Sequence, residues 1–445
     1  MKCLRNAVIL TAISTLLCAP TWAKDDDDKP NVAIERLEKM AKKGSAQAQS
    51  QLGSMYFDGK MGAKRDYSLA VYWFEKAAAQ GYANGQFNLA LCYEEGSGIE
   101  QDFDQALDLY KQAADQGLLQ AQINAAIILN MKRRYEEATR YLRMGALKGN
   151  YFCQREFARN LLMGRGADRN AEYALAFLKA ASDGGDAEAQ LLLADCYSGM
   201  YPTIPRDIQK MIDNLWAAAS AGIAEAQSKM GFCYEKGIGV EKDTETAVKW
   251  YTQAAEQGYA HAMVNLGHAY GEGRGVPRND DKAFDWYKQA ADTDNPVGLY
   301  NVGVCYAYGR GCANNDRLST INFETAAKLG YVKAQHNLAV AYEEGRGTEE
   351  NPTLAFFWYK QAASQGDTAA TTALGYCYFR GFGVRRDLAE ARKYFSSAAA
   401  KGSDEAQHAL QTLPGLPKGG PVTITPPEKT DNGIFETTPF NPQGR

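Results

Sequence analysis

Apolar residues along the chain recur at the spacing of one face of an α-helix, and the pattern returns about every 36 residues. In residues 223–258 the first half carries apolar side chains at i, i+4, i+7 and i+8 from Ala226, and the second half at i, i+3, i+4, i+7 and i+8 from Ala247. Each half therefore predicts an amphipathic α-helix. A turn at Gly237–Val240 separates the halves, and Gly258 supplies the left-handed conformation that closes the second helix. The unit is a predicted helix-turn-helix.

The glycine that ends the second helix recurs along the chain, with Asp294 in the one gap. The closing glycines are Gly44, Gly81, Gly117, Gly149, Gly185, Gly222, Gly258, Gly330, Gly366 and Gly402. Most intervals are 36 or 37 residues, but the one from Gly117 to Gly149 is 32 because the turn around Met131 to Arg134 is shorter, and we expect a tighter connection there. Neither helix can bury its stripe alone, so the units must stack. We predict an all-α fold, a right-handed α-α superhelical solenoid of about ten helix-turn-helix repeats.

Each second helix begins with a residue that is suited to cap it. In nine repeats an Asp or Asn stands fifteen residues before the closing position, where its side chain can accept hydrogen bonds from free amides of the first turn. These residues are Asp66, Asp102, Asn170, Asp207, Asp243, Asn279, Asn315, Asn351 and Asp387. Glycine also recurs inside the first helix, at Gly53, Gly231, Gly267, Gly303 and Gly375. Because glycine there costs about 1 kcal/mol relative to alanine, its recurrence predicts a close approach between the two helices.

The repeats are predicted to occupy residues 32–413. Residues 32–44 have the pattern of a lone second helix and residues 403–413 that of a lone first helix, so we expect half-repeat caps at both ends. Residues 414–445 are rich in proline, glycine and threonine, which predicts a disordered tail.

The first 23 residues have the organisation of a secretory signal peptide. Lys2 and Arg5 precede an apolar stretch at residues 7–18, and small residues end at Ala23. That stretch is too short to span a bilayer, and no later stretch is long enough, so no integral membrane segment is expected. We expect a periplasmic or secreted chain. The absence of an N-glycosylation sequon and of an endoplasmic-reticulum retention tail favours a bacterial source.

An acidic linker, residues 24–31, follows the predicted signal peptide. Its run Asp25–Lys29 resembles an enterokinase site, so it is either an engineered remnant or a natural linker, and the sequence does not decide between them. The formal net charge of the chain is −4. With no basic excess to neutralise phosphates, we expect no nucleic-acid partner.

Two motifs could be mistaken for ligand sites. Glycine-rich turns such as Gly271–Gly275 follow no predicted strand and lack the Gly-Lys-Ser/Thr of a phosphate loop. His261 and His268 lie seven residues apart on one predicted helix, with no third ligand at a suitable spacing. We therefore predict no nucleotide, no metal and no other cofactor.

The helix patterns, the caps and the glycines of the repeat together resemble a known family. The pattern Ala-x-x-x-Leu-Gly-x-x-Tyr-x-x-Gly-x-Gly-Val, an Asp cap, and Ala-x-x-Trp-Tyr-x-x-Ala-Ala-x-x-Gly is similar to the Sel-one-like repeat, a relative of the tetratricopeptide repeat. It is clearest in Ala262–Tyr270 and Ala247–Gly258, and it covers residues 32–413. The resemblance implies an exported scaffold or adaptor that binds a partner protein or peptide in a superhelical groove. It does not identify the partner.

Seven cysteines follow the predicted signal peptide, and five of them stand just before a tyrosine in the first helix. These five are Cys92, Cys196, Cys233, Cys305 and Cys377. Equivalent sites in neighbouring repeats are too far apart for a disulfide, so we interpret them as small buried hydrophobic residues. Cys312 replaces the valine of the turn, where the chain folds back toward Cys305. A Cys305–Cys312 disulfide is one interpretation, and two separate thiols is the other.

No serine elbow, Ser-x-x-Lys, His-Glu-x-x-His or Cys-x-x-Cys motif occurs, so we predict no catalytic residues and no enzyme activity. Two alternatives to the scaffold remain. A β-lactam-binding or cell-wall-related hydrolase is one, because some cysteine-rich relatives of the repeat have been linked to β-lactam chemistry. A secreted virulence factor that contacts host proteins is the other, and the sequence does not separate a host-directed role from one in the protein's own cell.

An asparagine recurs at one position of the first helix, in Asn88, Asn124, Asn265, Asn301 and Asn337. In tetratricopeptide-like superhelices this helix lines the inner curve, where asparagine could hold the amides of an extended peptide. A structural bond between successive turns of the solenoid is the competing explanation. We predict that the surface of the first helices is the docking face for a partner protein.

Overall fold

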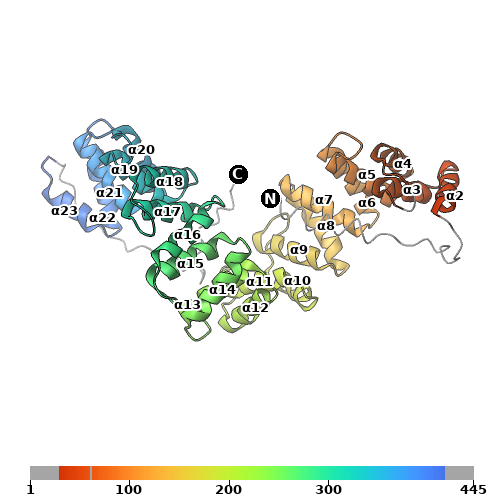
Figure 1. Ribbon diagram of the computed structural model, residues 1–445, viewed down its shortest axis with the longest axis horizontal. Helices are drawn as coiled ribbons and strands as arrows, with labels where there is room; N and C mark the ends of the chain where they lie inside the picture. Colours follow the sequence, from red (N-terminus) through yellow and green to blue (C-terminus); the bar gives the residue numbers. More distant parts are fainter. Residues whose placement is uncertain (1–29, 61–62, 416–445) are drawn as a thin grey trace. The chain divides into compact units, whose positions relative to one another are not determined.

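The computed structural model describes residues 30–60 and 63–415, and within them every regular element is an α-helix (Figure 1). The helices alternate between two sets. The first helices of the repeats, called A-helices here, are α3 (Ala46–Asp58), α5 (Ala83–Glu95), α7 (Leu119–Met131), α9 (Tyr151–Met163), α11 (Ala187–Tyr197), α13 (Ala224–Lys236), α15 (Ala260–Glu272), α17 (Pro296–Tyr308), α19 (Val332–Glu344), α21 (Thr368–Arg380) and α23 (Asp404–Thr412).

The second helices, called B-helices here, alternate with the A-helices and begin with α2. They are α2 (Pro30–Lys42), α4 (Tyr67–Ala79), α6 (Phe103–Asp115), α8 (Tyr135–Leu147), α10 (Ala171–Asp183), α12 (Ile208–Ser220), α14 (Thr244–Glu256), α16 (Asp280–Ala291), α18 (Asp316–Lys328), α20 (Pro352–Ser364) and α22 (Leu388–Ala400). The predicted signal peptide, nearly all of the acidic linker and nearly all of the predicted tail lie outside the described residues.

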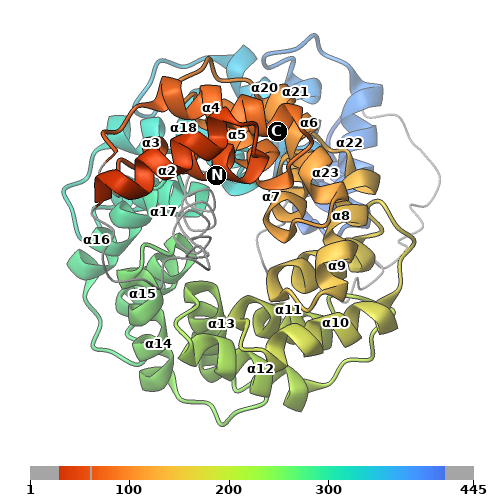
Figure 2. The same cartoon turned by 90° about the vertical axis from the view of Figure 1, so that its right-hand side faces the viewer.

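Helices that follow one another in the chain pack against one another. The chain divides into two compact units, Met1–Leu193 and Ala194–Arg445. In the second unit α12, α13, α14 and α15 lie side by side in chain order (Figure 2). The same succession holds in the first unit from α2 to α9. The prediction of an all-α solenoid of stacked helix pairs is confirmed.

The glycine inside the A-helix permits the contact with its B-helix, as predicted. A Cβ atom built on Gly267 would lie 2.3 Å from the ring of Tyr287 in α16, and one on Gly231 would lie 2.7 Å from the ring of Tyr251 in α14. Gly53, Gly303 and Gly375 face a B-helix phenylalanine ring in the same way. A larger residue at this position would push the paired helices apart.

All nine predicted N-caps are confirmed. The carboxylate of Asp243, for example, accepts hydrogen bonds from the backbone N–H groups of Glu245 and Thr246, each at 3.0 Å. The backbone N–H of Asp243 also donates to the carbonyl oxygen of Tyr234 in α13 at 2.9 Å. The same residue therefore caps the B-helix with its side chain and joins the turn to the A-helix with its backbone N–H.

The second glycine of the turn joins neighbouring repeats. Gly275 has a φ of +72°, and a Cβ atom on it would lie 2.1 Å from the carbonyl oxygen of Thr244. Thr244 is the first residue of α14, the B-helix of the preceding repeat. Only glycine fits this left-handed conformation and this close backbone contact, which explains why the turn recurs as Gly-x-Gly.

The repeat formed by α7 and α8 has the tighter connection that its shorter sequence predicts. Met131 ends α7 and Tyr135 begins α8, so three residues join the helices. Arg133 adopts a φ of 59° in this turn, and Arg134 at the N-cap makes no side-chain capping bond. The repeat has exchanged the capped turn of its neighbours for a short one.

A buried glutamine near the start of the A-helix joins three helices, and the repeat pattern of the sequence does not predict this role. The side-chain amide of Gln227 in α13 donates to the carbonyl oxygen of Ala219 in α12 at 3.2 Å. Its side-chain oxygen accepts from Gln257, the C-cap of α14, at 2.7 Å. Gln335 repeats both bonds, with Ala327 and Gln365. These bonds give a hydrogen-bond donor to a carbonyl in the last turn of the preceding B-helix, and they hold successive repeats against one another.

Candidate binding surface

The five predicted groove asparagines occupy the same position of five A-helices, and we call them the asparagine row. Each is the sixth residue of its helix and is partly exposed: Asn88 in α5, Asn124 in α7, Asn265 in α15, Asn301 in α17 and Asn337 in α19. Partial exposure leaves each amide able to contact both the protein and a bound molecule.

Four members of the asparagine row bond to the protein itself. The amide of Asn88 donates to Ser54 Oγ on the preceding A-helix at 3.3 Å, and that of Asn301 donates to the carbonyl oxygen of Val297 at 3.0 Å. Asn337 bonds to the hydroxyl of Tyr300 on α17, and Asn124 bonds to the hydroxyl of Tyr110 on α6. Three of these bonds join successive repeats, as the competing explanation expects, whereas the bond of Asn301 stays within α17. They use only part of the capacity of each amide, which has two donor hydrogens and an acceptor oxygen.

A second row of side chains runs beside the asparagine row in the second unit, three residues further along each A-helix. We call it the hydrophobic row; it consists of Phe232, His268, Val304, Val340 and Tyr376, all partly exposed. The Nδ1 atom of His268 lies 2.9 Å from the hydroxyl oxygen of Tyr287, and burial lowers the pKa of this histidine. His268 is therefore neutral at neutral pH, and the row is uncharged.

Lys229 interrupts the asparagine row in α13. Its side chain is only 9% exposed, and its Nζ lies 2.7 Å from a carboxylate oxygen of Asp195 in α11 and 2.8 Å from one of Glu225. Burial lowers the pKa of Lys229, but the two carboxylates raise it, and the net shift is upward. The lysine is thus held as a cation by its neighbours, and it links two successive A-helices.

A related contact joins an A-helix to the cap of the next one. In the first unit Nη1 of Arg155 lies 2.8 and 2.6 Å from the two carboxylate oxygens of Asp186, which precedes α11. In the second unit Nδ1 of His336 lies 3.5 Å from a carboxylate oxygen of Asp367, the N-cap of α21. His336 holds the pKa of Asp367 below its ordinary value. Both pairs fasten adjacent A-helices at one end.

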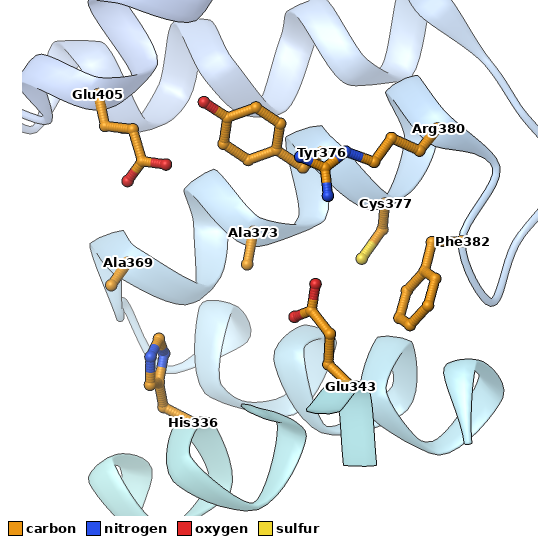
Figure 3. Close-up of a pocket in the computed structure, with 9 residues that line it drawn as sticks. All are labelled: His336, Glu343, Ala369, Ala373, Tyr376, Cys377, Arg380, Phe382 and Glu405. Atoms are coloured by element: carbon orange, nitrogen blue, oxygen red, sulfur yellow. The ribbon is translucent and has the colours of Figure 1, made fainter. Parts of the chain in front are cut away.

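A cavity of about 430 Å³ lies in the second unit where α19, α21 and α23 meet. Ala369 and Ala373 of α21 line it, together with Tyr376 and Arg380 one and two turns further along the same helix (Figure 3). Glu343 of α19 and Glu405 of α23 complete the charged lining, and their carboxylates face the cavity from opposite sides in Figure 3. This cavity could not be predicted from the sequence, because its signal is only two alanines at positions where most repeats have larger residues.

The seven cysteines of the described residues are free thiols. Cys305 and Cys312 are among them, so no disulfide joins this pair in the structure. Cys312 is half-buried, and the other six are buried. Burial raises the pKa of the Cys233 thiol to about 12, and the pKa of Cys92, Cys153, Cys196, Cys305 and Cys377 rises to about 12 for the same leading reason. They remain protonated at neutral pH.

The remaining chemistry of the described residues is limited. No group of three or more His, Cys, Asp or Glu side chains there could hold a metal ion. In residues 30–60 and 63–415, none of the helices has the length and apolar character needed to cross a membrane.

Comparisons with known proteins follow the repeat boundaries. A family model described as Sel1 repeat matches nine segments of the chain, which together make up more than half of it. The matched residues are 46–82, 83–118, 154–186, 187–210, 224–259, 260–295, 296–331, 332–367 and 368–403. Residues 119–153, which include the α7–α8 repeat with its shortened turn, lie outside the matched segments. The model therefore finds the repeats in which the full turn is present.

Curated relatives share part of this array. DAP3-binding cell death enhancer 1 of Rattus norvegicus is 32% identical over 237 residues, which cover 52% of this chain and 39% of that protein. Chitin synthase regulatory factor 3 of Schizosaccharomyces pombe is 26% identical over 308 residues, which cover 55% of this chain and 33% of that protein. The chain thus spans less than half the length of these relatives.

A solved structure covers more of the chain. The protein c5321, described as a protective antigen present in uropathogenic Escherichia coli strains displaying an SLR fold, is 28% identical. It matches with a TM-score of 0.55 and covers 84% of this chain and 89% of its own.

Proposed function

We propose that this chain, which belongs to the Sel1 repeat family, is an exported scaffold that binds a partner protein or peptide along its A-helices. The observation that carries the proposal is the pair of parallel rows on the A-helices of the second unit. The asparagine row offers amide donors and acceptors at the spacing of successive repeats, and the hydrophobic row lies beside it. Amides can pair with the backbone of an extended segment while the hydrophobic row receives its apolar side chains.

Export is part of the proposal and rests on the sequence alone. Residues 1–23 have the pattern of a signal peptide, which supports a periplasmic or secreted location in a bacterium. Fractionation of the native host checks this directly. We expect the protein in periplasm or culture fluid, with an N-terminus at Lys24, and recovery with the cytoplasmic fraction would contradict it.

One observation favours a second candidate, a secreted factor that contacts host proteins. The chain is similar over most of its length to c5321, which is described as a protective antigen. An antigen that protects must be accessible to the host, so a host protein is the alternative source of the partner. The binding surface would be the same, because both candidates use the A-helices.

The thiols give no support to a hydrolase. The thiolate is the nucleophilic form of cysteine, and burial raises the pKa of six of the seven thiols to about 12. The seventh, Cys312, also has a raised pKa because of burial. The family fold itself is typical of scaffolds for other proteins.

A paired substitution tests the proposed surface. Val304→Asp with Val340→Asp places two charges on the hydrophobic row. Ile321→Asp with Phe357→Asp makes the same change on the B-helices, where these side chains are 46% and 45% exposed. Residues 24–445 of each variant would be used to capture partners from periplasm, culture fluid and host extract. Each captured protein would then be purified and its Kd measured directly.

We expect to capture a partner that binds the natural chain and the B-helix variant with the same Kd. The same partner should bind the A-helix variant much more weakly or not at all. Thermal unfolding of both variants is the control for folding. Equal binding to both variants, or loss in the B-helix variant alone, would refute the assignment to the A-helices.

A further inference from the structure

The cavity between α19, α21 and α23 exists because two positions of α21 carry alanine. Ala373 is the sixth residue of α21, the position of the asparagine row, and Ala369 is its second residue. The corresponding second residues of α15 and α19 are His261 and Lys333. Removal of both larger side chains leaves the space of about 430 Å³. The opening is therefore a specific property of this repeat rather than of the whole array.

The walls of the cavity carry charge of both signs. Glu343 accepts a hydrogen bond from the hydroxyl of Tyr359 at 2.6 Å, and Glu405 accepts one from Tyr376. Each carboxylate has about four acceptor sites, so most of them remain available. Two carboxylates and one guanidinium, that of Arg380, line the cavity together with His336, whose Nδ1 lies 3.5 Å from a carboxylate oxygen of Asp367.

Arg380 is placed to act on a ligand. Its guanidinium carbon lies 5.3 Å from the ring centre of Tyr376, a stacking contact that leaves its N–H groups open. Among the described residues no ion pair joins Arg380 to a carboxylate. A guanidinium has five N–H donors, and a carbonyl or carboxylate oxygen in the cavity would receive them.

We infer that this cavity binds the first residue of a partner chain, with its free α-ammonium group between Glu343 and Glu405. The first carbonyl oxygen accepts from Arg380, and the first side chain lies on the apolar surface of Ala369 and Ala373. The inference rests on the proposed function and specifies which part of a partner the second unit holds. Two carboxylates match a cation, and the nearby guanidinium requires an acceptor a few bonds away from it.

Ligands of a single charge fit less well. An acidic side chain would pair with Arg380 but would meet two carboxylates, and like charges at close range are unfavourable. A lysine side chain would satisfy the carboxylates and leave the donors of Arg380 unused. The start of a peptide chain satisfies both, because its ammonium and first carbonyl are joined through a single carbon.

Synthetic peptides test this inference without knowledge of the natural partner. The probe is the hexapeptide Leu-Gly-Ser-Gly-Ser-Gly with fluorescein at its C-terminus, and fluorescence anisotropy with residues 24–445 gives the Kd. Three companion ligands are the N-acetylated peptide, an N-acetylated peptide that begins with lysine, and free leucinamide as competitor. We expect acetylation to weaken binding by about tenfold or more, because it removes the charge that the carboxylates pair with.

Three variants locate the contact. Ala373→Asn restores the residue of the asparagine row and fills the cavity, and Glu405→Gln removes one exposed carboxylate. Asp404→Asn makes the same change of charge one residue earlier, at a position that does not line the cavity. We expect the first two variants to lose the preference for the free amine and the third to keep it.

Several results would overturn the inference. They are equal binding of the free and acetylated peptides, unchanged binding by Ala373→Asn, and absence of binding up to about 1 mM. If the acetylated lysine peptide binds as tightly as the free amine, the cavity binds a lysine side chain and does not require an α-ammonium group. Leucinamide carries the same ammonium group, first carbonyl and side chain as the peptide, so leucinamide that fails to compete would show that the peptide is held elsewhere. A natural partner that still binds the Ala373→Asn variant would leave the proposed scaffold function intact, so the two failures are distinguishable.

Discussion

Replacement of Lys148 by glutamine should stabilise the first unit. In four repeats the C-cap residue of the B-helix is a glutamine that donates to the buried glutamine of its A-helix. The pairs are Gln80–Gln49, Gln116–Gln86, Gln257–Gln227 and Gln365–Gln335, at 2.7, 2.7, 2.7 and 2.8 Å. In the α7–α8 repeat the C-cap is Lys148, and the buried side-chain oxygen of Gln122 accepts no hydrogen bond.

The size of the effect follows from the two bonds that change. A glutamine at 148 would supply the missing donor, and a hydrogen bond to a buried group contributes about 1 kcal/mol net. The substitution also removes the bond from Lys148 Nζ to the carbonyl oxygen of Gly117. That bond is exposed and is worth less, because water replaces it. We expect a net gain of about 1 kcal/mol for the α7–α8 repeat.

Hydrogen exchange is the suitable assay, because the stability of a repeat array is approximately a sum of local terms. The unfolding midpoint of the whole chain would show only a small part of a change in one repeat. A gain of about 1 kcal/mol slows amide exchange about fivefold in α7 and α8 where local opening governs it. Lys148→Ala removes the Gly117 bond without adding a donor and should not slow exchange. In a Gln122→Leu background the glutamine at 148 should give no protection. Equal exchange in Lys148→Gln and Lys148→Ala would show that a glutamine at position 148 does not donate to the side-chain oxygen of Gln122.

Three further predictions concern packing, thiols and pH. Gly267→Ala should destabilise the second unit by about 1–3 kcal/mol, because its Cβ would lie 2.3 Å from the ring of Tyr287, whereas Gly271→Ala in the same helix meets nothing nearer than 3.6 Å and should be neutral or stabilising in urea unfolding. Iodoacetamide at pH 8 should modify half-buried Cys312 faster than the six buried thiols in the native chain of residues 24–445, and mass spectrometry should find all seven thiols modified in urea; a buried thiol modified as fast as Cys312 would contradict this. The lowered pKa of Asp367 contributes stability that is present above the ordinary pKa of 3.8 and is lost as pH falls through the folded value. Asp367→Asn keeps the cap, so urea unfolding should show it less stable than the natural chain at pH 5, with the difference vanishing toward pH 2.

Much of the fold could be predicted because its determinants are local and repeated. Nine N-caps and five A-helix glycines stand at fixed intervals, so each repeat confirms the interpretation of the others. The close contact at Gly267 could be inferred from the cost of glycine in a helix, without knowledge of the ring that fills the space. The glutamine ties could not be inferred in the same way, because Gln227 has partners eight residues before it and thirty residues after it. Nothing in the local pattern names such partners.

The candidate binding surface likewise has features that the local sequence predicts and features that it does not. The asparagine row was visible as a recurrence, but its bonds to Ser54 and Tyr300 depend on what stands on the neighbouring A-helix. Lys229 and Ala373 were visible only as departures from the row. Their consequences, a buried ion pair in one case and a cavity in the other, come from packing between repeats.

These departures bear on how a repetitive surface can be selective. A contact that is identical in every repeat gives a partner the same interaction at each register, so it supports affinity and leaves the position along the array undetermined. Lys229 and Ala373 replace asparagine in α13 and α21, and they put an ion-paired lysine at one point of the row and a cavity at another. A segment that extends along the asparagine row of the second unit meets a nearly buried lysine paired with two carboxylates at α13, and a cavity at α21. Specificity is a difference between competing arrangements, and two unlike marks on one row distinguish both the register and the direction of the bound chain. The positions that break the repeat are therefore the ones at which substitutions should redirect binding.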